Sequence, residues 1–152
     1  MVPNWPQDAI ISFNMCEEEF RSIPLPDHVQ RTRRWYSLAL WKSESVVLFG
    51  STELNTLFPA SFEMWVMVIE GDFTHWTKHL TIGPLGCIKG LLDFWKYDEL
   101  LIETTDGLVA SYNLYNRSLR KLPIHEAVLP WATHAELYTK SLVSVKGGRC
   151  FT

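Results

Sequence analysis

The feature that most constrains this chain is an internal repeat of a short hairpin pattern. Residues 11–15 read Ile-Ser-Phe-Asn-Met and residues 110–114 read Ala-Ser-Tyr-Asn-Leu; at the same offset of 99 positions, residues 20–25 read Phe-Arg-Ser-Ile-Pro-Leu and residues 119–124 read Leu-Arg-Lys-Leu-Pro-Ile. Each pair of segments has strand-like composition and flanks a polar stretch, which is typical of a β hairpin. Because one repeat cannot bury its apolar face alone, the pattern predicts hairpins stacked beside one another.

A degenerate third copy lies between the first two. Residues 64–67 read Met-Trp-Val-Met, and residues 76–78 read Trp-Thr-Lys. The third copy is offset from the others by about half of the 99 positions that separate the first two copies. The repeat period is therefore about 50 residues, as in kelch-like propellers, whose blades have four strands each. We expect about three blades, one of them running roughly over Phe62–Trp95 and the next from Glu99 onward. A closed propeller needs at least about four blades, so the prediction is an incomplete ring.

The remaining apolar segments are short and evenly spaced, and no window of helical length shows a period of 3.6 residues. The dipeptide Asp106-Gly107 is a strong signal for a two-residue hairpin turn. The fold class is therefore predicted to be all-β, built from antiparallel hairpins. The expected strands are Ala9–Met15, Phe20–Ile23, Ser37–Trp41, Ser45–Phe49, Phe62–Ile69, Thr74–Thr81, Gly90–Trp95, Glu99–Thr104, Leu108–Leu114 and Leu137–Val145.

Composition predicts one folded domain and argues against several functional classes. The 152 residues are 47% hydrophobic and include 7 Trp, 8 Phe and 5 Tyr, so we expect a single domain over 1–152 with an aromatic core. A net charge of -3 gives no general attraction for nucleic acid. The longest apolar runs fall short of the roughly 20 residues of a membrane helix. No secretory pattern opens the sequence, so the expected location is cytoplasmic.

The sequence carries no recognisable catalytic or cofactor motif, so we expect a protein that is not an enzyme and takes no cofactor. His75 and His79 share one face of a predicted strand, but no third ligand has recognisable spacing, so no metal site is expected. The cysteines Cys16, Cys87 and Cys150 are odd in number and lack CxxC spacing. They are interpreted as small buried apolar residues.

Several short motifs follow one another along the chain, and they are Ile11–Pro26, Trp65–Met67, Trp76–Lys78, Phe94–Leu101, Asp106-Gly107, Ser111–Leu114 and Leu122–His125. Their order resembles the F-box-associated domain of plant F-box proteins over nearly the whole chain. Within that family it is most similar to the S-locus F-box proteins of self-incompatibility, through residues 94–101 and the terminal Ser-Leu-Val-Ser-Val of residues 141–145. No F-box helical segment precedes Ile11, so adaptor and cullin binding would belong to the missing F-box.

The resemblance implies the substrate-recognition part of an F-box ubiquitin ligase, expressed in pollen, with a protein client that would be an S-ribonuclease. The alternative is a carbohydrate- or other ligand-binding β domain outside the ubiquitin pathway, which would use exposed tryptophans. We expect the large rings of Trp65, Trp76 and Trp95 to fill the space between sheets instead.

Three groups of residues are candidates for contact with a protein partner. A basic cluster follows the first hairpin and could pair with carboxylates, although a solvated loop is the alternative. A non-repetitive segment at 50–61 lies between strands, where binding residues gather. An acidic turn in the first hairpin would steer a basic client. The candidates are Arg31, Arg33 and Arg34; Glu53, Asn55 and Phe58; and Glu17, Glu18 and Glu19.

Overall fold

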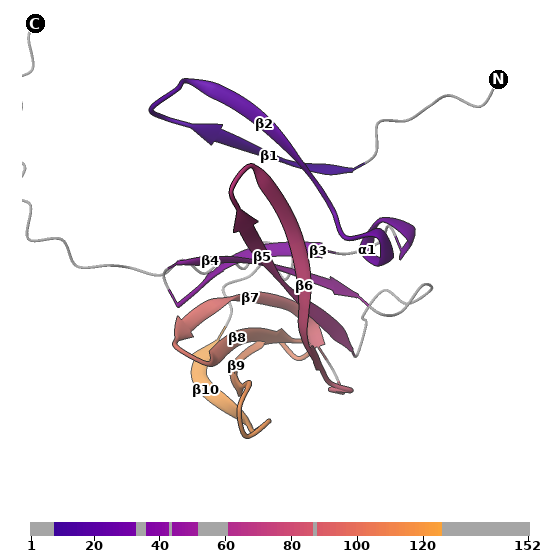
Figure 1. Cartoon of the computed structure of the whole chain (residues 1–152). Coiled ribbons are helices and arrows are strands. Elements are labelled where there is room, and N and C mark those ends of the chain that lie inside the picture. Colours follow the sequence, from indigo (N-terminus) through magenta and orange to yellow (C-terminus); the bar gives the residue numbers. More distant parts are fainter. Residues whose placement is uncertain (1–7, 33–35, 43, 52–60, 87, 126–152) are drawn as a thin grey trace, which may run out of the picture.

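The computed structural model describes residues 8–32, 36–42, 44–51, 61–86 and 88–125, which form three antiparallel sheets and one short helix (Figure 1). The predicted all-β, antiparallel class is confirmed, and the described strands close no ring. The elements are β1 (Ala9–Asn14), β2 (Glu19–Pro24), α1 (Asp27–Thr32), β3 (Tyr36–Trp41), β4 (Ser45–Ser51), β5 (Phe62–Glu70), β6 (Phe73–Ile82), β7 (Ile88–Lys96), β8 (Glu99–Thr104), β9 (Leu108–Asn113) and β10 (Leu119–His125).

The strands follow one another as meanders. Strands β1 and β2 form a two-stranded sheet, β3 to β6 form a four-stranded sheet in chain order, and β7 to β10 form a second one. The expected unit boundaries, Phe62–Trp95 and Glu99 onward, are therefore wrong. The turn after Lys96 joins β7 to β8 within one sheet, whereas the break falls after β6, where Gly83 and Pro84 follow. Proline supplies no N–H to a ladder, which favours an end to pairing there.

The predicted hairpin repeat is present with the same strand register in both copies. In the first copy, Phe13 lies opposite Phe20. In the second, Tyr112 lies opposite Leu119, 99 positions further along on both strands. Because register decides which face each side chain occupies, equal register places corresponding residues of the two hairpins on corresponding faces. The predicted final strand Leu137–Val145 lies outside the described residues.

The turns of the two hairpins share their chemistry as well. Asn14 Oδ1 accepts hydrogen bonds from the backbone N–H groups of Cys16 at 2.9 Å and Glu17 at 3.3 Å. Asn113 Oδ1 accepts the corresponding bonds from Tyr115 at 2.9 Å and Asn116 at 3.1 Å. An asparagine that binds backbone amides beyond it nucleates a turn, which explains why the repeat retains this residue.

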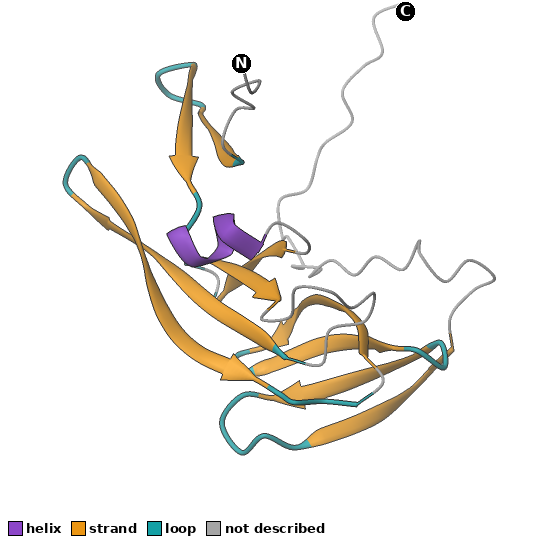
Figure 2. Ribbon diagram, turned by 90° about the vertical axis from the view of Figure 1, so that its right-hand side faces the viewer, coloured by secondary structure: helices purple, strands orange, loops and turns teal. Residues whose placement is uncertain are grey.

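The main core lies between the two four-stranded sheets, which Figures 1 and 2 show packed against each other. Phe49 and Met64 of the first sheet and Leu100 of the second belong to one buried cluster. The Phe49 and Phe94 ring centroids are 5.9 Å apart, within the range of favourable tilted aromatic pairs. Trp41 adds a hydrogen bond from Nε1 to the Tyr97 carbonyl at 2.9 Å. The two larger sheets therefore share one core.

A second, smaller cluster holds the first hairpin and α1 to the rest. Leu25, Val29 and Leu48 are buried together, with Trp65 and Trp76 packed against them. The two rings thus fill space between the first four-stranded sheet and the α1 region, whereas the prediction placed them between sheets.

Sequence periodicity missed α1 because a helix of six residues is too short for the pattern to emerge. Its local signals are Pro26 immediately before it and Asp27 in its first turn, where an acidic side chain favours the helix N-terminus. Gly50 of β4 permits the close approach of α1, since a Cβ there would lie 3.1 Å from Val29 Cγ2.

Candidate functional site

A groove of about 430 Å³ lies between the β1–β2 hairpin and the outer part of the β5–β6 hairpin. One wall carries Phe13, Arg21 and Ile23, and the other carries Met67 and Asp72 among its lining residues. In Figure 1 the β1–β2 hairpin stands apart from the two large sheets, above the end of β5 and β6. The groove therefore joins apolar and charged side chains from two segments that are distant in the sequence.

The β1–β2 wall exposes large apolar side chains. Phe13 is 49% exposed and Met15 83%, while the corresponding Tyr112 is 3% exposed and Leu114 8%. Phe20, directly opposite Phe13, is 74% exposed. The two phenylalanine ring centroids are 4.7 Å apart. Side chains at the same hairpin positions are therefore buried in the four-stranded sheet and exposed in the two-stranded sheet.

The other wall ends in a turn that is also apolar and acidic. Ile69 is 65% exposed and Phe73 is 79% exposed, and they flank Glu70, Gly71 and Asp72. Gly71 has φ of 59°, a conformation that glycine adopts without a steric penalty. Exposed aromatic and aliphatic side chains on adjacent hairpins are typical of interaction surfaces.

The predicted acidic candidates lie at the tip of the first hairpin. Glu17, Glu18 and Glu19 are all exposed. Arg21 Nη2 lies 2.8 Å from Glu17 Oε2, so this glutamate is linked to a residue that lines the groove. Glu18 occupies the left-handed region with φ of 53°, which directs the chain back into β2. Cys16 is exposed in the same turn, so the prediction that it is buried is wrong. Its neighbours form a polar turn with no core to enter.

The other candidates lie wholly or partly outside the described residues. Arg31 lies within α1, not in a loop, and its side chain is outside the described part of the chain. The remaining candidates fall in ranges that the structure does not describe, as does Cys87. Those candidates are Arg33, Arg34, Glu53, Asn55 and Phe58.

A buried carboxylate that sequence reasoning missed positions α1 and β6. The side chain of Glu63 is only 9% exposed; its Oε1 lies 2.6 Å from Lys78 Nζ and its Oε2 lies 3.0 Å from His28 Nδ1. Trp65 Nε1 donates to the same Oε2 at 3.3 Å. Burial alone would raise the pKa of Glu63, but the Lys78 hydrogen bond, the nearby His28 charge and the Trp65 hydrogen bond lower it overall. A charged residue between Phe62 and Met64 was the available signal, because a buried carboxylate requires partners.

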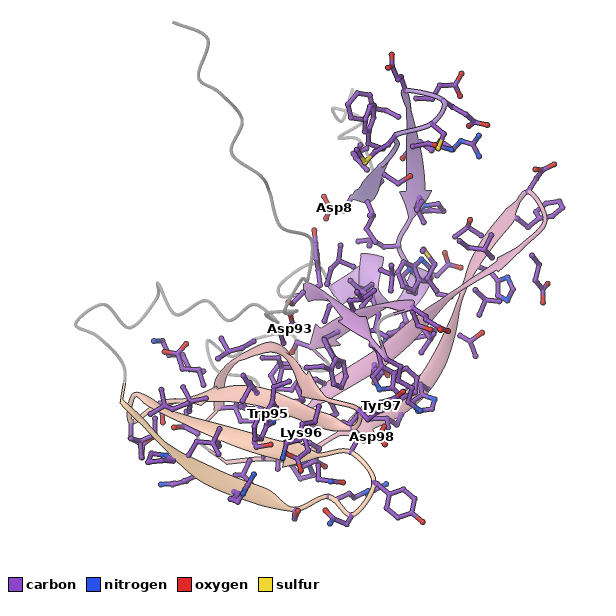
Figure 3. All side chains as sticks on the ribbon, turned by 90° about the vertical axis from the view of Figure 1, so that its left-hand side faces the viewer. Asp8, Asp93, Trp95, Lys96, Tyr97 and Asp98 are labelled. Carbon is purple, nitrogen blue, oxygen red and sulfur yellow. The ribbon has the colours of Figure 1, made fainter. Side chains whose placement is uncertain are left out.

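The described tryptophans use their indole N–H groups within the protein. Trp95, labelled with Lys96 in Figure 3, donates to Ser111 Oγ at 2.8 Å, and Ser111 donates to Glu99 Oε2 at 2.9 Å. Lys96 Nζ lies 4.2 Å from the Trp95 ring centroid, and the Arg120 guanidinium carbon lies 5.9 Å from it. Cations therefore occupy the surface of this ring, unlike the predicted filling of a space between sheets. Nothing in this arrangement favours a sugar-stacking platform. Internal indole bonds are also made by Trp41, Trp65 and Trp76.

The described residues define an all-β protein with a groove between hairpins that is lined by apolar and polar side chains, among them Arg21 and Asp72. Within them, no group of three or more His, Cys, Asp or Glu side chains is placed to hold a metal ion. No helix in that part of the chain has the length and apolar character needed to cross a membrane. Comparisons with protein-family models, with curated proteins and with solved structures each gave no match.

Proposed function

We propose that this chain is a protein-recognition module whose contact site is the groove between the β1–β2 and β5–β6 hairpins. The observation that carries the proposal is the contrast between the two hairpin copies. Phe13 and Met15 are exposed, whereas their counterparts Tyr112 and Leu114 are buried. Exposed aromatic residues supply much of the binding free energy at protein interfaces.

The module is further proposed to be the substrate-recognition part of an F-box ubiquitin ligase, acting in the cytoplasm. The order of motifs from Ile11 to His125 supports this assignment by resemblance. Its two larger sheets would be kelch-like blades of an incomplete ring, and an F-box outside these residues would bind the adaptor and cullin. The client would be an S-ribonuclease, and the acidic residues Glu18, Glu19 and Asp72 around the groove suit a basic client through electrostatic steering.

The direct test is to measure binding of the full chain to a panel of purified S-ribonucleases by biolayer interferometry. We expect at least one of them to bind, and Phe20→Ala to weaken that binding about tenfold or more, as loss of an interface aromatic does. Leu119→Ala is the matched control because Leu119 holds the same position in the second hairpin copy. It should leave binding unchanged.

Two results would contradict the proposal at different levels. Equal affinity of Phe20→Ala and the unchanged protein would remove the exposed phenylalanine pair as a contact site, since Phe20 packs against Phe13 of the groove. Failure of every S-ribonuclease to bind, with the chain shown to be folded by circular dichroism, would remove the self-incompatibility client.

A further inference from the structure

Among the residues that the structure describes, the first hairpin has an unpaired edge at the position where the other sheets continue. Strand β9 lies between β10 and β8, and β5 lies between β6 and β4. Strand β1 corresponds to β9 in the repeat, yet among the described residues it pairs only with β2. An unpaired edge presents backbone N–H and C=O groups that another extended segment can bind.

The second copy shows which backbone groups face that edge. Asn113 N–H donates to the Ser118 carbonyl at 2.9 Å on the β10 side, while Leu114 N–H donates to the Asp98 carbonyl at 2.8 Å on the β8 side. Successive residues of a strand point their backbone groups to alternate sides, so Tyr112 and Ala110 face β8. The corresponding backbone groups of the first copy belong to Phe13 and Ile11, which therefore face the unpaired edge of β1.

Strand β8 also shows which side chains a strand at this edge needs. Leu100 lies opposite Tyr112, and Ile102 lies opposite Ala110. Leu100, Ile102 and Ala110 are all 0% exposed. In the first copy the equivalent Ile11 is 63% exposed. A strand with apolar residues at alternate positions would pair with Phe13 and Ile11 and cover this face.

Charge distinguishes the two copies where their backbones agree. Glu18 and Arg117 hold equivalent turn positions with φ of 53° and 58°. The fold therefore accepts either charge at this position. The turn and β2 of the first hairpin carry Glu17, Glu18 and Glu19 against the single cation Arg21. The turn and β10 of the second copy carry Arg117, Arg120 and Lys121. The acidity of the first hairpin is thus independent of its backbone and complements a basic partner.

We propose that the free edge of β1 binds an extended segment of a partner protein as an added antiparallel strand, with apolar residues at alternate positions and basic residues around them. This inference rests on the proposed role in protein recognition and specifies the partner's chemistry. Backbone hydrogen bonds supply affinity in such strand addition, and the alternate side chains supply specificity.

A synthetic peptide provides a direct probe. It carries the Leu-Leu-Ile sequence of β8 between lysines, and fluorescence polarisation measures its binding to the full chain. We expect binding that weakens roughly tenfold when glutamates replace the lysines, because several exposed charge pairs change sign. N-methylation of the peptide at alternate backbone nitrogens should abolish binding. Equal affinity for the lysine and glutamate peptides, or full affinity after methylation, would overturn the proposal.

Two variants of the protein locate the binding edge. Ile11→Pro removes the N–H that faces the open edge, and proline is tolerated on edge strands whose N–H points to solvent. It should weaken peptide binding about tenfold or more, whereas Ile11→Val keeps the N–H and should bind normally. If Ile11→Pro binds the peptide normally while Phe20→Ala loses S-ribonuclease binding, strand addition is wrong and the recognition role stands.

Hydrogen exchange of the Ile11 and Phe13 amides distinguishes three possible occupants of the β1 edge, which are a partner strand, another segment of this chain and a second copy. A foreign strand predicts fast exchange in the full chain alone and slow exchange with the lysine peptide. Slow exchange in dilute protein without peptide would assign the edge to this chain itself. Slow exchange that appears only as protein concentration rises would assign it to a second copy. Either of these last two results would overturn the proposal of a basic partner strand.

Discussion

Removing the turn asparagine from each hairpin copy should have different consequences for stability. Asn113→Ala deletes an acceptor of two backbone hydrogen bonds, from Tyr115 at 2.9 Å and Asn116 at 3.1 Å. Asn14→Ala deletes the equivalent pair, with distances of 2.9 and 3.3 Å. Because the freed amides are exposed and can bind water, each bond is worth about 0.5–1 kcal/mol, giving about 1–2 kcal/mol per turn.

The surroundings of each turn decide whether its loss lowers the free energy of global unfolding or only that of local opening. The Asn113 turn closes a hairpin whose Tyr112 and Leu114 belong to the main core, so the loss should lower the free energy of global unfolding. The Asn14 turn closes a two-stranded hairpin whose apolar side chains are largely exposed. Such a hairpin can open without unfolding the large sheets, so its loss should be local.

Urea unfolding followed by tryptophan fluorescence measures the free energy of global unfolding. Amide hydrogen exchange measures the free energy of local opening of each hairpin. We expect Asn113→Ala to lose about 1–2 kcal/mol globally. Asn14→Ala should stay within about 0.3 kcal/mol globally while β1 and β2 amides exchange roughly tenfold faster. Equal global losses in both variants would refute the view that the first hairpin opens independently.

Three further predictions concern packing and charge. Folding lowers the pKa of Glu63, so the ionised carboxylate stabilises the folded protein at pH values above its unfolded-state pKa of 4.5. This stabilisation is lost as the pH falls through the lower pKa of the folded state. Glu63→Gln should therefore flatten the acid limb of stability in urea titrations at stepped pH. Leu100→Ala, at a 0% exposed site, should lower the unfolding free energy by about 2–5 kcal/mol, whereas Leu38→Ala, at a 46% exposed site, should cost under about 0.5 kcal/mol in the same assay. Trp76→Phe removes the 2.8 Å bond from Nε1 to the Pro24 carbonyl and should speed exchange of β2 amides several-fold, by about 1 kcal/mol of local stability.

Most strands could be predicted because their signals are local. Glu99–Thr104 was predicted with the bounds that β8 has, since Tyr97-Asp98 and Asp106-Gly107 mark both of its ends. The grouping of strands into sheets could not be predicted in the same way. Gly83 and Pro84 disfavour pairing after β6, but Gly71 and Gly107 lie in turns within one sheet, so a local turn signal alone does not say which strands share a sheet.

The candidate site was only partly predictable. The acidic turn at Glu17 could be found from composition, whereas the groove beside it depends on the approach of β5 and β6, which no spacing in the sequence encodes. The buried carboxylate of Glu63 was missed for a related reason. Its partners His28 and Lys78 come from α1 and β6, and only the folded chain brings them together.

The contrast between Phe13 and Tyr112 separates what a hairpin sequence specifies from what its neighbours supply. Both residues hold one register position, and both are large aromatic side chains. Tyr112 is covered because Leu100 pairs beside it and the facing sheet packs over it. Phe13 lacks both kinds of cover among the described residues and is 49% exposed, so it gains less burial free energy in the isolated fold than Tyr112 does. The area of Phe13 that stays exposed would be buried by a neighbouring strand, which is the role that the proposed partner segment would have.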